Sequence, residues 1–299
     1  MSLLVVGSVA LDSVKTPFAE ASDVLGGAAV YFSTAASIFT QVKLVGVIGS
    51  DFPKEHMEYL KNRGIDIKGL KTEEGKTFRW SGSYSQSFNE ANTLDTQLNV
   101  FASFNPTLPQ DYKDAKCVFL ANIDPALQLN VLQQVESPKI IALDTMNYWI
   151  DNKKEALLKT IKEVDIMIIN DAEAKQLSGE HNINKAMEKI ISWGLKCIIV
   201  KRGEYGSVTI HSEGYFSLPA YPLREVIDPT GAGDTFAGGF MGYLASVEDI
   251  GFNRIKEAMA YGTALASFNV EDFSLGRLKT VRKEEVIERV ERLREMMRF

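Results

Sequence analysis

Short apolar runs alternate with longer amphipathic stretches through the second half of the chain. In each amphipathic stretch, apolar side chains recur every three or four positions, as they do on one face of a helix. Strands that alternate with helices form right-handed β-α-β units, and such units build a parallel sheet covered on both faces. Apolar runs at 3–6 and 43–48 add strands. The other expected strands are 117–121, 140–143, 166–169 and 197–200, and the expected helices are 125–135, 153–164, 172–177, 184–193 and 283–297.

The later strands share a second feature, because each runs into a polar or charged residue. These residues are Asn122, Asp144, Asn170 and Lys201, in chain order. In open α/β sheets, ligands bind at the carboxyl ends of the strands. One such residue could simply begin a loop, but four in succession predict a shared ligand-binding edge.

The stretch 77–104 departs from this alternation and follows a period of two. Aromatic and polar residues alternate before an Asn-rich turn that contains Asn89 and Asn92, and apolar and polar residues alternate after it, as far as Phe104. This pattern predicts an inserted antiparallel hairpin. A two-stranded ribbon is marginal alone, so its apolar face must cover a site or a partner's ribbon. A weaker pattern over 14–25 adds a further strand.

Composition narrows the class of protein. The chain has 299 residues, 45% of them hydrophobic, which suits one domain over 1–299. Its net charge of -6 and the lack of a long basic run argue against nucleic acid or an anionic membrane as the main partner. The apolar start lacks a basic segment and is typical of a first strand, not a signal peptide, and no apolar run approaches membrane length. Cys117 and Cys197 each open an apolar run, as buried reduced thiols do, so we expect a cytoplasmic protein.

The segment 228–236 carries the strongest chemical signal. Gly231 and Gly233 let the backbone approach phosphate oxygens, and Ala232 is small enough not to obstruct them. A helical pattern follows at once, and the N-terminus of a helix attracts anions. Asp234 lies at the edge of this turn, where a carboxylate can take the proton from an incoming hydroxyl. Asp234 could instead be a plain helix cap, but a cap needs neither glycine. The segment therefore predicts a phosphoryl-transfer site.

Two further segments suit a hydroxylated substrate. Gly26 and Gly27 precede an apolar helical stretch and permit close approach of the backbone, although a tight turn into a helix explains them equally well. Asp12 follows the first strand, where a carboxylate can accept hydrogen bonds from two hydroxyls of a polyol. The chain contains neither G-x-G-x-x-G nor the P-loop motif, which argues against a dinucleotide oxidoreductase and a P-loop enzyme.

The turn at 228–236 resembles the C-terminal signature of the ribokinase-like (phosphofructokinase-B type, PfkB) kinases, and the resemblance covers essentially the whole chain. It implies an α/β ribokinase-like fold, with a mostly parallel central sheet flanked by helices. It implies that the inserts at about 14–25 and 77–104 form a small antiparallel β lid, which in this family is often a homodimer contact. The implied reaction transfers the γ-phosphate of ATP, with Mg²⁺, to a hydroxyl of a small-molecule sugar or nucleoside.

The resemblance also assigns roles to single residues. Asp234 would be the catalytic base, and the turn at 231–234 would be the anion hole. Lys201 stands where the family often has a small hydroxyl residue, so it could add positive charge at the phosphates or be a solvated lysine. Glu173 would order Mg²⁺ through water, although helix capping explains its N-x-x-E motif equally well. The implied substrate contacts are Asp12, Gly26, Gly27, Tyr31 and Asn122, the implied nucleotide contacts are Asn170, Lys201, Gly203, Gly206 and Asn269, and the implied ligands of a monovalent cation such as K⁺ are Asp228 and Thr230.

One departure from the family pattern bears on the substrate. Many sugar kinases of the family carry Asn four residues after the second glycine, where this chain has Tyr31. A phenol in place of an amide argues against a simple hexose or ribose. Aromatic residues near the expected pocket favour a nucleoside, but the choice between sugar and nucleoside stays open; these residues are Tyr31, Phe32, Trp80 and Phe88.

Two alternatives of the same fold remain. A vitamin-precursor kinase fits the fold, although the Gly26-Gly27 turn and the long hairpin argue against it. A non-catalytic nucleotide- or sugar-binding regulator would be expected to lose Asp234, which this chain keeps. An unperturbed aspartate has a pKa of about 3.9, so we expect Asp234 to be ionised at neutral pH.

Overall fold

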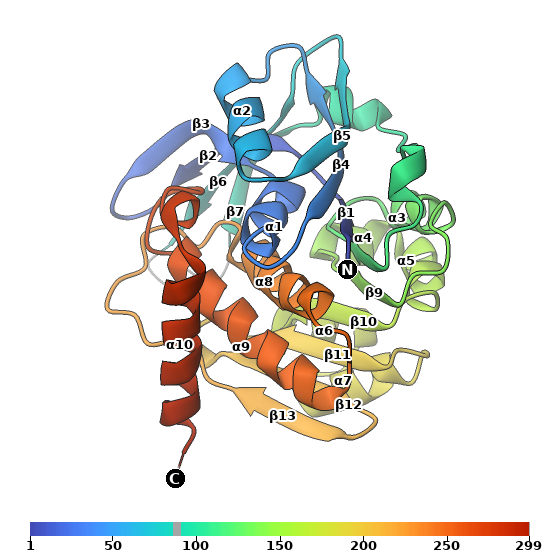
Figure 1. Ribbon diagram of the computed structural model, residues 1–299, viewed down its shortest axis with the longest axis vertical. Coiled ribbons are helices and arrows are strands. Elements are labelled where there is room, and N and C mark those ends of the chain that lie inside the picture. The colour runs from blue at the N-terminus through green and yellow to red at the C-terminus, as the bar shows by residue number, and fades with distance from the viewer. Residues whose placement is uncertain (86–90, 299) are drawn as a thin grey trace.

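A nine-stranded sheet forms the centre of the computed structural model, which describes residues 1–85 and 91–298 (Figure 1). Its strands run parallel from β5 to β11, and β12 and β13 continue the sheet antiparallel at one edge. This confirms the mostly parallel sheet expected from the alternating pattern. In spatial order the strands are β13 (Gly214–Leu218), β12 (Ser207–His211), β11 (Cys197–Lys201), β10 (Ile166–Asn170), β9 (Ile140–Leu143), β8 (Cys117–Leu120), β1 (Leu3–Val6), β4 (Val42–Gly49) and β5 (Asp66–Glu73).

Helices cover both faces of the sheet, because its central strands are apolar on both sides. Leu3 and Val5 of β1 join the core on one face, and Leu4 and Val6 join the core on the other. The first face is covered by α1 (Ala28–Ala36), α2 (Lys54–Asn62), α8 (Ala232–Ser246), α9 (Phe252–Asn269) and α10 (Lys283–Met296). The second is covered by α3 (Pro125–Leu132), α4 (Asn147–Asn152), α5 (Lys154–Ile161), α6 (Asp171–Ser178) and α7 (Ile183–Ile191).

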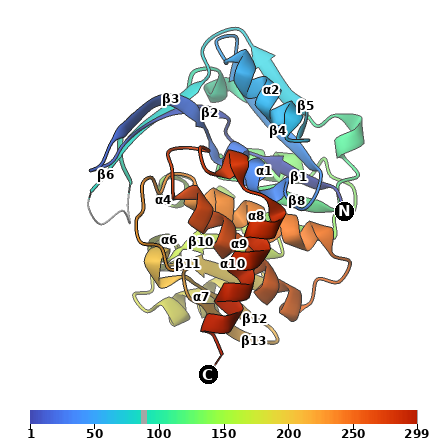
Figure 2. The same ribbon diagram turned by 60° about the vertical axis from the view of Figure 1, so that its left-hand side comes forward.

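A smaller sheet projects from one side of this body (Figure 2). Its order is β3 (Glu20–Gly26), β2 (Ala10–Lys15), β6 (Phe78–Tyr84) and β7 (Ala91–Gln97). The pairs β2–β3 and β6–β7 are antiparallel, whereas β2 and β6 run parallel. The weak pattern over 14–25 thus belongs to two strands, and its role as a lid stays a prediction.

The structure corrects the hairpin at its downstream end. The strand does not reach Phe104, because β7 ends at Gln97 and a 3₁₀ helix follows over Asn99–Ser103. Val100 and Phe104 are buried in the main core, whereas Leu94 and Leu98 remain 58% and 47% exposed. The turn at the hairpin tip, including Asn89 and the aromatic Phe88, lies outside the described residues.

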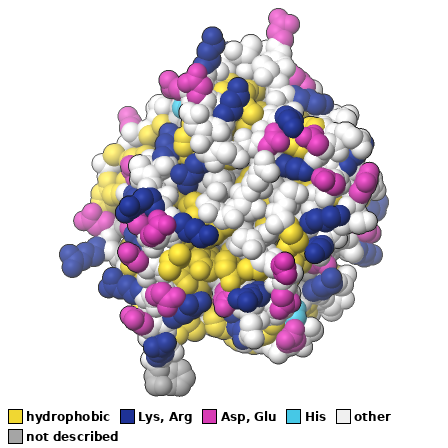
Figure 3. All heavy atoms as spheres, viewed as in Figure 1, with side chains coloured by type: hydrophobic (Ala, Val, Ile, Leu, Met, Phe, Trp, Pro, Cys, Tyr) yellow, Lys and Arg dark blue, Asp and Glu magenta, His cyan; other side chains and the backbone are white. Residues whose placement is uncertain are grey.

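Charged side chains of both signs lie on the surface. On the face shown in Figure 3, acidic and basic side chains are interspersed. In the part of the chain that the structure describes, we find no helix with the length and apolar character to cross a membrane.

Candidate active site

The turn before α8 is held in a left-handed conformation at the carboxyl edge of the main sheet. Gly231 is the N-cap of α8 with a φ of 74°. The N–H of Ala232 donates to Pro229 O at 3.1 Å, so this amide is already used, contrary to the expectation for the whole turn. The N–H groups of Gly233 and Asp234 lie in the first helical turn, where the helix provides no carbonyl for them. These two amides and the helix N-terminus are the groups of this turn that remain available to an anion.

Buried polar side chains clamp this turn. Asp228 accepts hydrogen bonds from the N–H of Thr230 (2.9 Å) and from the N–H of Ser274 (3.1 Å). Asn269, at the end of α9, donates to Thr230 O at 2.7 Å and accepts from the Thr235 hydroxyl at 3.1 Å. Asn269 is buried and uses its amide within the protein. It therefore supports the turn and does not offer a free group to a nucleotide.

Tyr31 forms one wall of the turn. A Cβ on Gly231 would lie 2.4 Å from the ring of Tyr31, so only glycine fits between them. The Tyr31 hydroxyl is buried and has no hydrogen-bond partner in the described structure. Burial, together with the carboxylates of Asp12 and Asp228, raises the pKa of Tyr31 well above its ordinary value. The residue that departs from the family pattern thus packs directly against the predicted anion hole.

Asp234 is partly buried in the first turn of α8. Burial raises its pKa to about 7, with Asp144 and Asp12 adding to the rise and Lys201 opposing it. The expectation of a fully ionised carboxylate at neutral pH is therefore wrong, because that expectation assumed a solvated group. The charge of Asp12 is one cause of the raised pKa of Asp234, so the predicted substrate carboxylate lies near enough to the predicted base to affect its protonation.

Lys201 ends β11 and points at the turn. Its ammonium lies 2.8 Å from the position that a Cβ on Gly233 would occupy, and 3.5 Å from Asp144 Oδ2. Burial alone would lower the pKa of Lys201, but Asp144, Glu173 and Asp234 together raise it, so the ammonium stays charged. Of the two interpretations of Lys201, the solvated lysine is wrong.

The N-x-x-E motif forms a capping box at the start of α6. Asn170 Oδ1 accepts from the N–H of Glu173, and Glu173 Oε2 accepts from the N–H of Asn170, both at 2.8 Å. Asn170 is also the register partner of Lys201 in the neighbouring strand. Burial raises the pKa of Glu173 to about 7, and Asp144 adds to the rise. The motif is thus a cap that uses one oxygen of Glu173, and the pKa of this carboxyl group is affected by the charges of Asp144, Lys201 and Asp234.

Asp12 is buried where β2 meets the Gly26-Gly27 turn. Its carboxylate accepts from the N–H of Gly27 at 3.3 Å, and a Cβ on Gly26 would lie 1.9 Å from Asp12 Oδ2. The glycine pair is therefore required for the placement of this carboxylate. Burial raises the pKa of Asp12 to about 7.

The smaller sheet reaches the turn through Tyr84 of β6. The Thr230 hydroxyl and the Tyr84 hydroxyl are 3.3 Å apart, and Tyr84 is mostly buried. Trp80 of the same strand lies over Gly82, where a Cβ would meet the indole at 2.2 Å. Aromatic side chains of β6 therefore stand beside the predicted site.

The other predicted contacts have structural partners. Asn122 Oδ1 accepts from the indole N–H of Trp149 in α4 at 2.9 Å. Gly203 opens a 3₁₀ turn over Gly203–Tyr205 with a φ of 54°. Gly206 has a φ of 83°, and a Cβ there would lie 2.0 Å from Leu218 O. The backbone at the end of β13 therefore leaves no room for a Cβ at position 206, and this alone requires glycine there.

The acidic groups suit Mg²⁺ only together with a ligand. Among the described residues, no cluster of acidic, histidine or cysteine side chains could hold a metal ion alone. Mg²⁺ usually keeps several waters and binds one or two carboxylates plus substrate phosphates, which matches the free oxygen of Glu173. The acceptors of Asp228 and Thr230 already bind protein N–H groups. Their role with a monovalent cation stays a prediction, and no step below depends on it.

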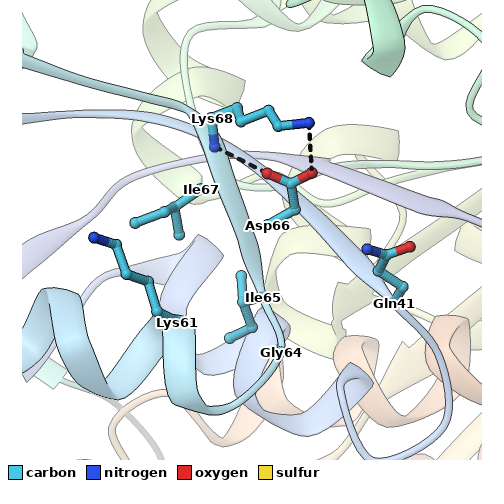
Figure 4. A pocket seen from close by; sticks show the side chains of 7 residues that line it. All are labelled: Gln41, Lys61, Gly64, Ile65, Asp66, Ile67 and Lys68. Carbon is cyan, nitrogen blue, oxygen red and sulfur yellow. Dashed lines mark hydrogen bonds and ion pairs between the residues drawn. The ribbon is translucent and has the colours of Figure 1, made fainter.

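The sequence pointed to Asp144 only as one of the four polar strand ends at the expected ligand edge, without a role in the site. It gave no role in the site to Tyr84, because the contact of Tyr84 depends on the packing of the smaller sheet. A separate hollow between α2 and β5, shown in Figure 4, is lined by Gln41, Lys61 and 64–68. It lies at the amino end of β5, opposite the edge that carries the site.

Comparison with known proteins identifies the family and agrees with the fold. The family model described as pfkB family carbohydrate kinase matches residues 6–280. The chain is 29% identical to a cytidine kinase of Thermococcus kodakarensis, over 87% of this chain and 96% of that protein. It is 27% identical to a nucleoside kinase of Methanocaldococcus jannaschii, over 89% of each chain. A crystal structure of aminoimidazole riboside kinase from Salmonella enterica, in complex with aminoimidazole riboside and an ATP analogue, has a TM-score of 0.77 at 17% identity and covers 97% of this chain and 100% of its own.

Proposed function

The chain belongs to the pfkB family of carbohydrate kinases, and we propose that it transfers the γ-phosphate of ATP to a hydroxyl of a nucleoside. The observation that supports this proposal is Asp234, a partly buried carboxyl group in the first turn of α8 whose pKa is raised by burial and, in part, by the substrate-side Asp12. The family acts on alcohol groups. The cytidine and nucleoside kinases among the relatives, and the aromatic residues Tyr31, Trp80 and Tyr84 around the site, favour a nucleoside over a simple sugar.

The reaction follows from the placement of these groups. Asp12 accepts hydrogen bonds from acceptor hydroxyls, and Asp234 takes the proton of the attacking hydroxyl as its oxygen bonds to the γ-phosphorus. The bond from that phosphorus to the bridging oxygen breaks, and ADP leaves. The transition state is loose, so positioning and charge stabilisation matter more than strong base catalysis.

The groups around the phosphate stabilise the developing charge. The N–H groups of Gly233 and Asp234 face it from the helix start, and Lys201 adds a positive charge from β11. Preorganised donors of this kind typically contribute about 10²–10³ each in rate. Glu173 would hold the water shell of a Mg²⁺ ion bound to the nucleotide, and this ion would supply positive charge to neutralise the polyphosphate.

The test is ADP release by the wild-type protein across nucleosides and sugars, with Mg²⁺ and ATP. We expect a nucleoside to be the best acceptor, and cytidine is the first candidate. Asp234→Asn should keep ATP binding and lower turnover by at least about 10²-fold, the low end of general-base contributions. Asp249→Asn is the matched control, because Asp249 is an exposed aspartate just beyond the other end of α8. Near-normal turnover of Asp234→Asn would remove Asp234 from the mechanism, and a preference for sugars would remove the nucleoside.

A further inference from the structure

Asp144 and Lys201 form a buried ion pair at the phosphate end of the site. Their side chains are 7% and 18% exposed, and 3.5 Å separates Lys201 Nζ from Asp144 Oδ2. The other side of the ammonium is 2.8 Å from the place of a Cβ on Gly233. The ammonium thus lies between one carboxylate and the backbone of the anion-binding turn.

Hydrogen bonds hold the backbone at Asp144 in place. Asp144 N–H donates to Leu120 O at 2.9 Å, and Asp144 Oδ1 accepts from the N–H of Thr145 at 2.8 Å. Gln128 of α3 is fully buried and donates to Ala121 O (2.9 Å) and Asp144 O (3.0 Å). These bonds tie the ends of β8 and β9 together and leave Asp144 Oδ2 directed at Lys201.

The charges around Lys201 are unbalanced. Asp144, which follows β9, pairs with the ammonium, and the charges of Glu173 in α6 and Asp234 in α8 also act on it. A buried ion pair contributes little to stability on balance, because desolvation offsets the attraction. An ion pair at this edge of the sheet, against the turn that receives an anion, is better explained by function than by stability.

We propose that Asp144 is a positioning residue for phosphoryl transfer, which holds the Lys201 ammonium over Gly233 until the terminal phosphate of the nucleotide becomes its partner. The inference rests on the proposed function, because it needs a nucleoside triphosphate at the turn. Asp144 itself touches neither the nucleotide nor the acceptor. It acts through Lys201, so its effect should vanish when Lys201 is absent.

The test is a double-mutant cycle on the full chain, with the affinities for ADP and for a non-hydrolysable ATP analogue measured by calorimetry in the presence of Mg²⁺. The two ligands differ by the terminal phosphate, so the ratio of their affinities reports its contact. Lys201→Met should lower that ratio by about tenfold or more, the usual effect of losing a hydrogen bond to a charged group. Asp144→Asn should lower it by a smaller factor, and the double variant should match Lys201→Met alone.

Two results would overturn the proposal. One is an Asp144→Asn variant with an unchanged ratio, which is the outcome for a merely structural ion pair. The other is an equal loss from Asp144→Asn with and without Lys201, which would show independent action. Lys196→Met is the control, because Lys196 precedes β11 at the end opposite Lys201, pairs with Asp165 at 2.7 Å and should leave the ratio unchanged.

A second variant tests the proposal if Asp144→Asn does not fold. Lys201→Arg keeps the charge, but its larger planar head should not fit between Asp144 and Gly233. We expect the ratio of the two affinities to fall. A ratio equal to that of the wild type would show that charge alone suffices and that no positioning is needed. The measurement uses no acceptor. A failure to phosphorylate nucleosides would therefore contradict the proposed function, whereas the affinity ratios would still test the role of Asp144.

Discussion

Asp234 carries a carboxyl group whose pKa is raised to about 7, first by burial and then by Asp144. The group must lose its proton to act as a base, so we expect kcat/KM for the nucleoside to fall as pH drops through about 7. Burial raises the pKa values of Asp12 and Glu173 to about 7 as well, which should make the fall steeper than a single ionisation.

A pH–rate profile measured from about pH 5 to 9 checks this prediction. An acidic limb near pH 4, the ordinary range of a solvated carboxyl group, would contradict it. The Asp249→Asn variant should reproduce the wild-type profile, since Asp249 is exposed.

The same residue shows what local sequence can and cannot predict. The glycines beside Asp234 and the helix after it are neighbours in the chain, so the turn was predictable from the sequence. Its pKa was not, because Asp144 and Lys201 come from strands that only the fold brings to this edge. The packing of Tyr31 against Gly231 was hidden for the same reason.

The turn before α8 depends on glycine for two separable reasons. Gly231 has a φ of 74°, and a Cβ would also meet the Tyr31 ring at 2.4 Å. Gly179 has the same φ at the end of α6, with nothing within 4 Å of its Cβ position. We expect Gly179→Ala to cost about 1–2 kcal/mol of unfolding free energy and to keep full activity. Gly231→Ala should cost more and should lower kcat strongly, because either the ring or the anion-binding amides must move.

Urea unfolding and steady-state kinetics on the two variants separate these effects. Equal losses of stability with equal activity would show that the contact with Tyr31 is unimportant for the turn.

The smaller sheet contacts the turn through one pair of hydroxyls, Tyr84 and Thr230. Tyr84→Phe removes this contact and keeps the ring. We expect a modest loss of stability, about 0.5–1.5 kcal/mol. We also expect more ADP release without acceptor relative to the rate with nucleoside, because a looser sheet admits water to the phosphate.

The measurement is ADP release with and without nucleoside, and Tyr215→Phe is the control, since Tyr215 is exposed on β13. An unchanged ratio of the two rates in Tyr84→Phe would argue against a lid role for the smaller sheet.

Elements with a strong local pattern were predicted, and pairings between distant segments were not. The apolar strands and amphipathic helices from residue 117 onward lie where expected, within a few residues. The parallel pairing of β2 with β6 joins segments more than sixty residues apart, and no local periodicity encodes it. The 3₁₀ turn at Asn99–Ser103 replaced an expected strand because burial of Val100 and Phe104 in the main core determined the backbone there.

At the scale of the whole molecule, the site brings together acids from distant elements whose pKa values are raised. Asp12 comes from β2, Glu173 from α6 and Asp234 from α8, and each has a pKa raised to about 7. The unfolded chain keeps their ordinary values near 4, so between about pH 4 and 7 the folded protein binds more protons than the unfolded chain. Stability must then fall as pH rises through that window.

Acids with lowered pKa values act in the opposite direction at lower pH. Their contribution to the stability of the fold is present above the ordinary pKa of about 4 and is lost only below it. These acids are Asp51, Asp111, Asp114, Glu257 and Glu285. The acids with raised pKa values therefore dominate the pH dependence of stability between about pH 5 and 8. There, one buried acid with a pKa of about 7 contributes about 2 kcal/mol.

We therefore expect the ligand-free protein to unfold at a higher temperature near pH 5 than near pH 8, by several degrees. Burial also raises the pKa values of Asp144 and Asp228, which act in the same direction. Asp234→Asn removes one of these acids with a raised pKa, so its unfolding temperature should change less with pH, whereas Asp249→Asn should follow the wild type. Differential scanning calorimetry of the three proteins across this range makes the comparison. A stability that rises from pH 5 to 8 would mean that these carboxyl groups are ionised without cost in the folded protein, and that the site is more open to water than its burial indicates.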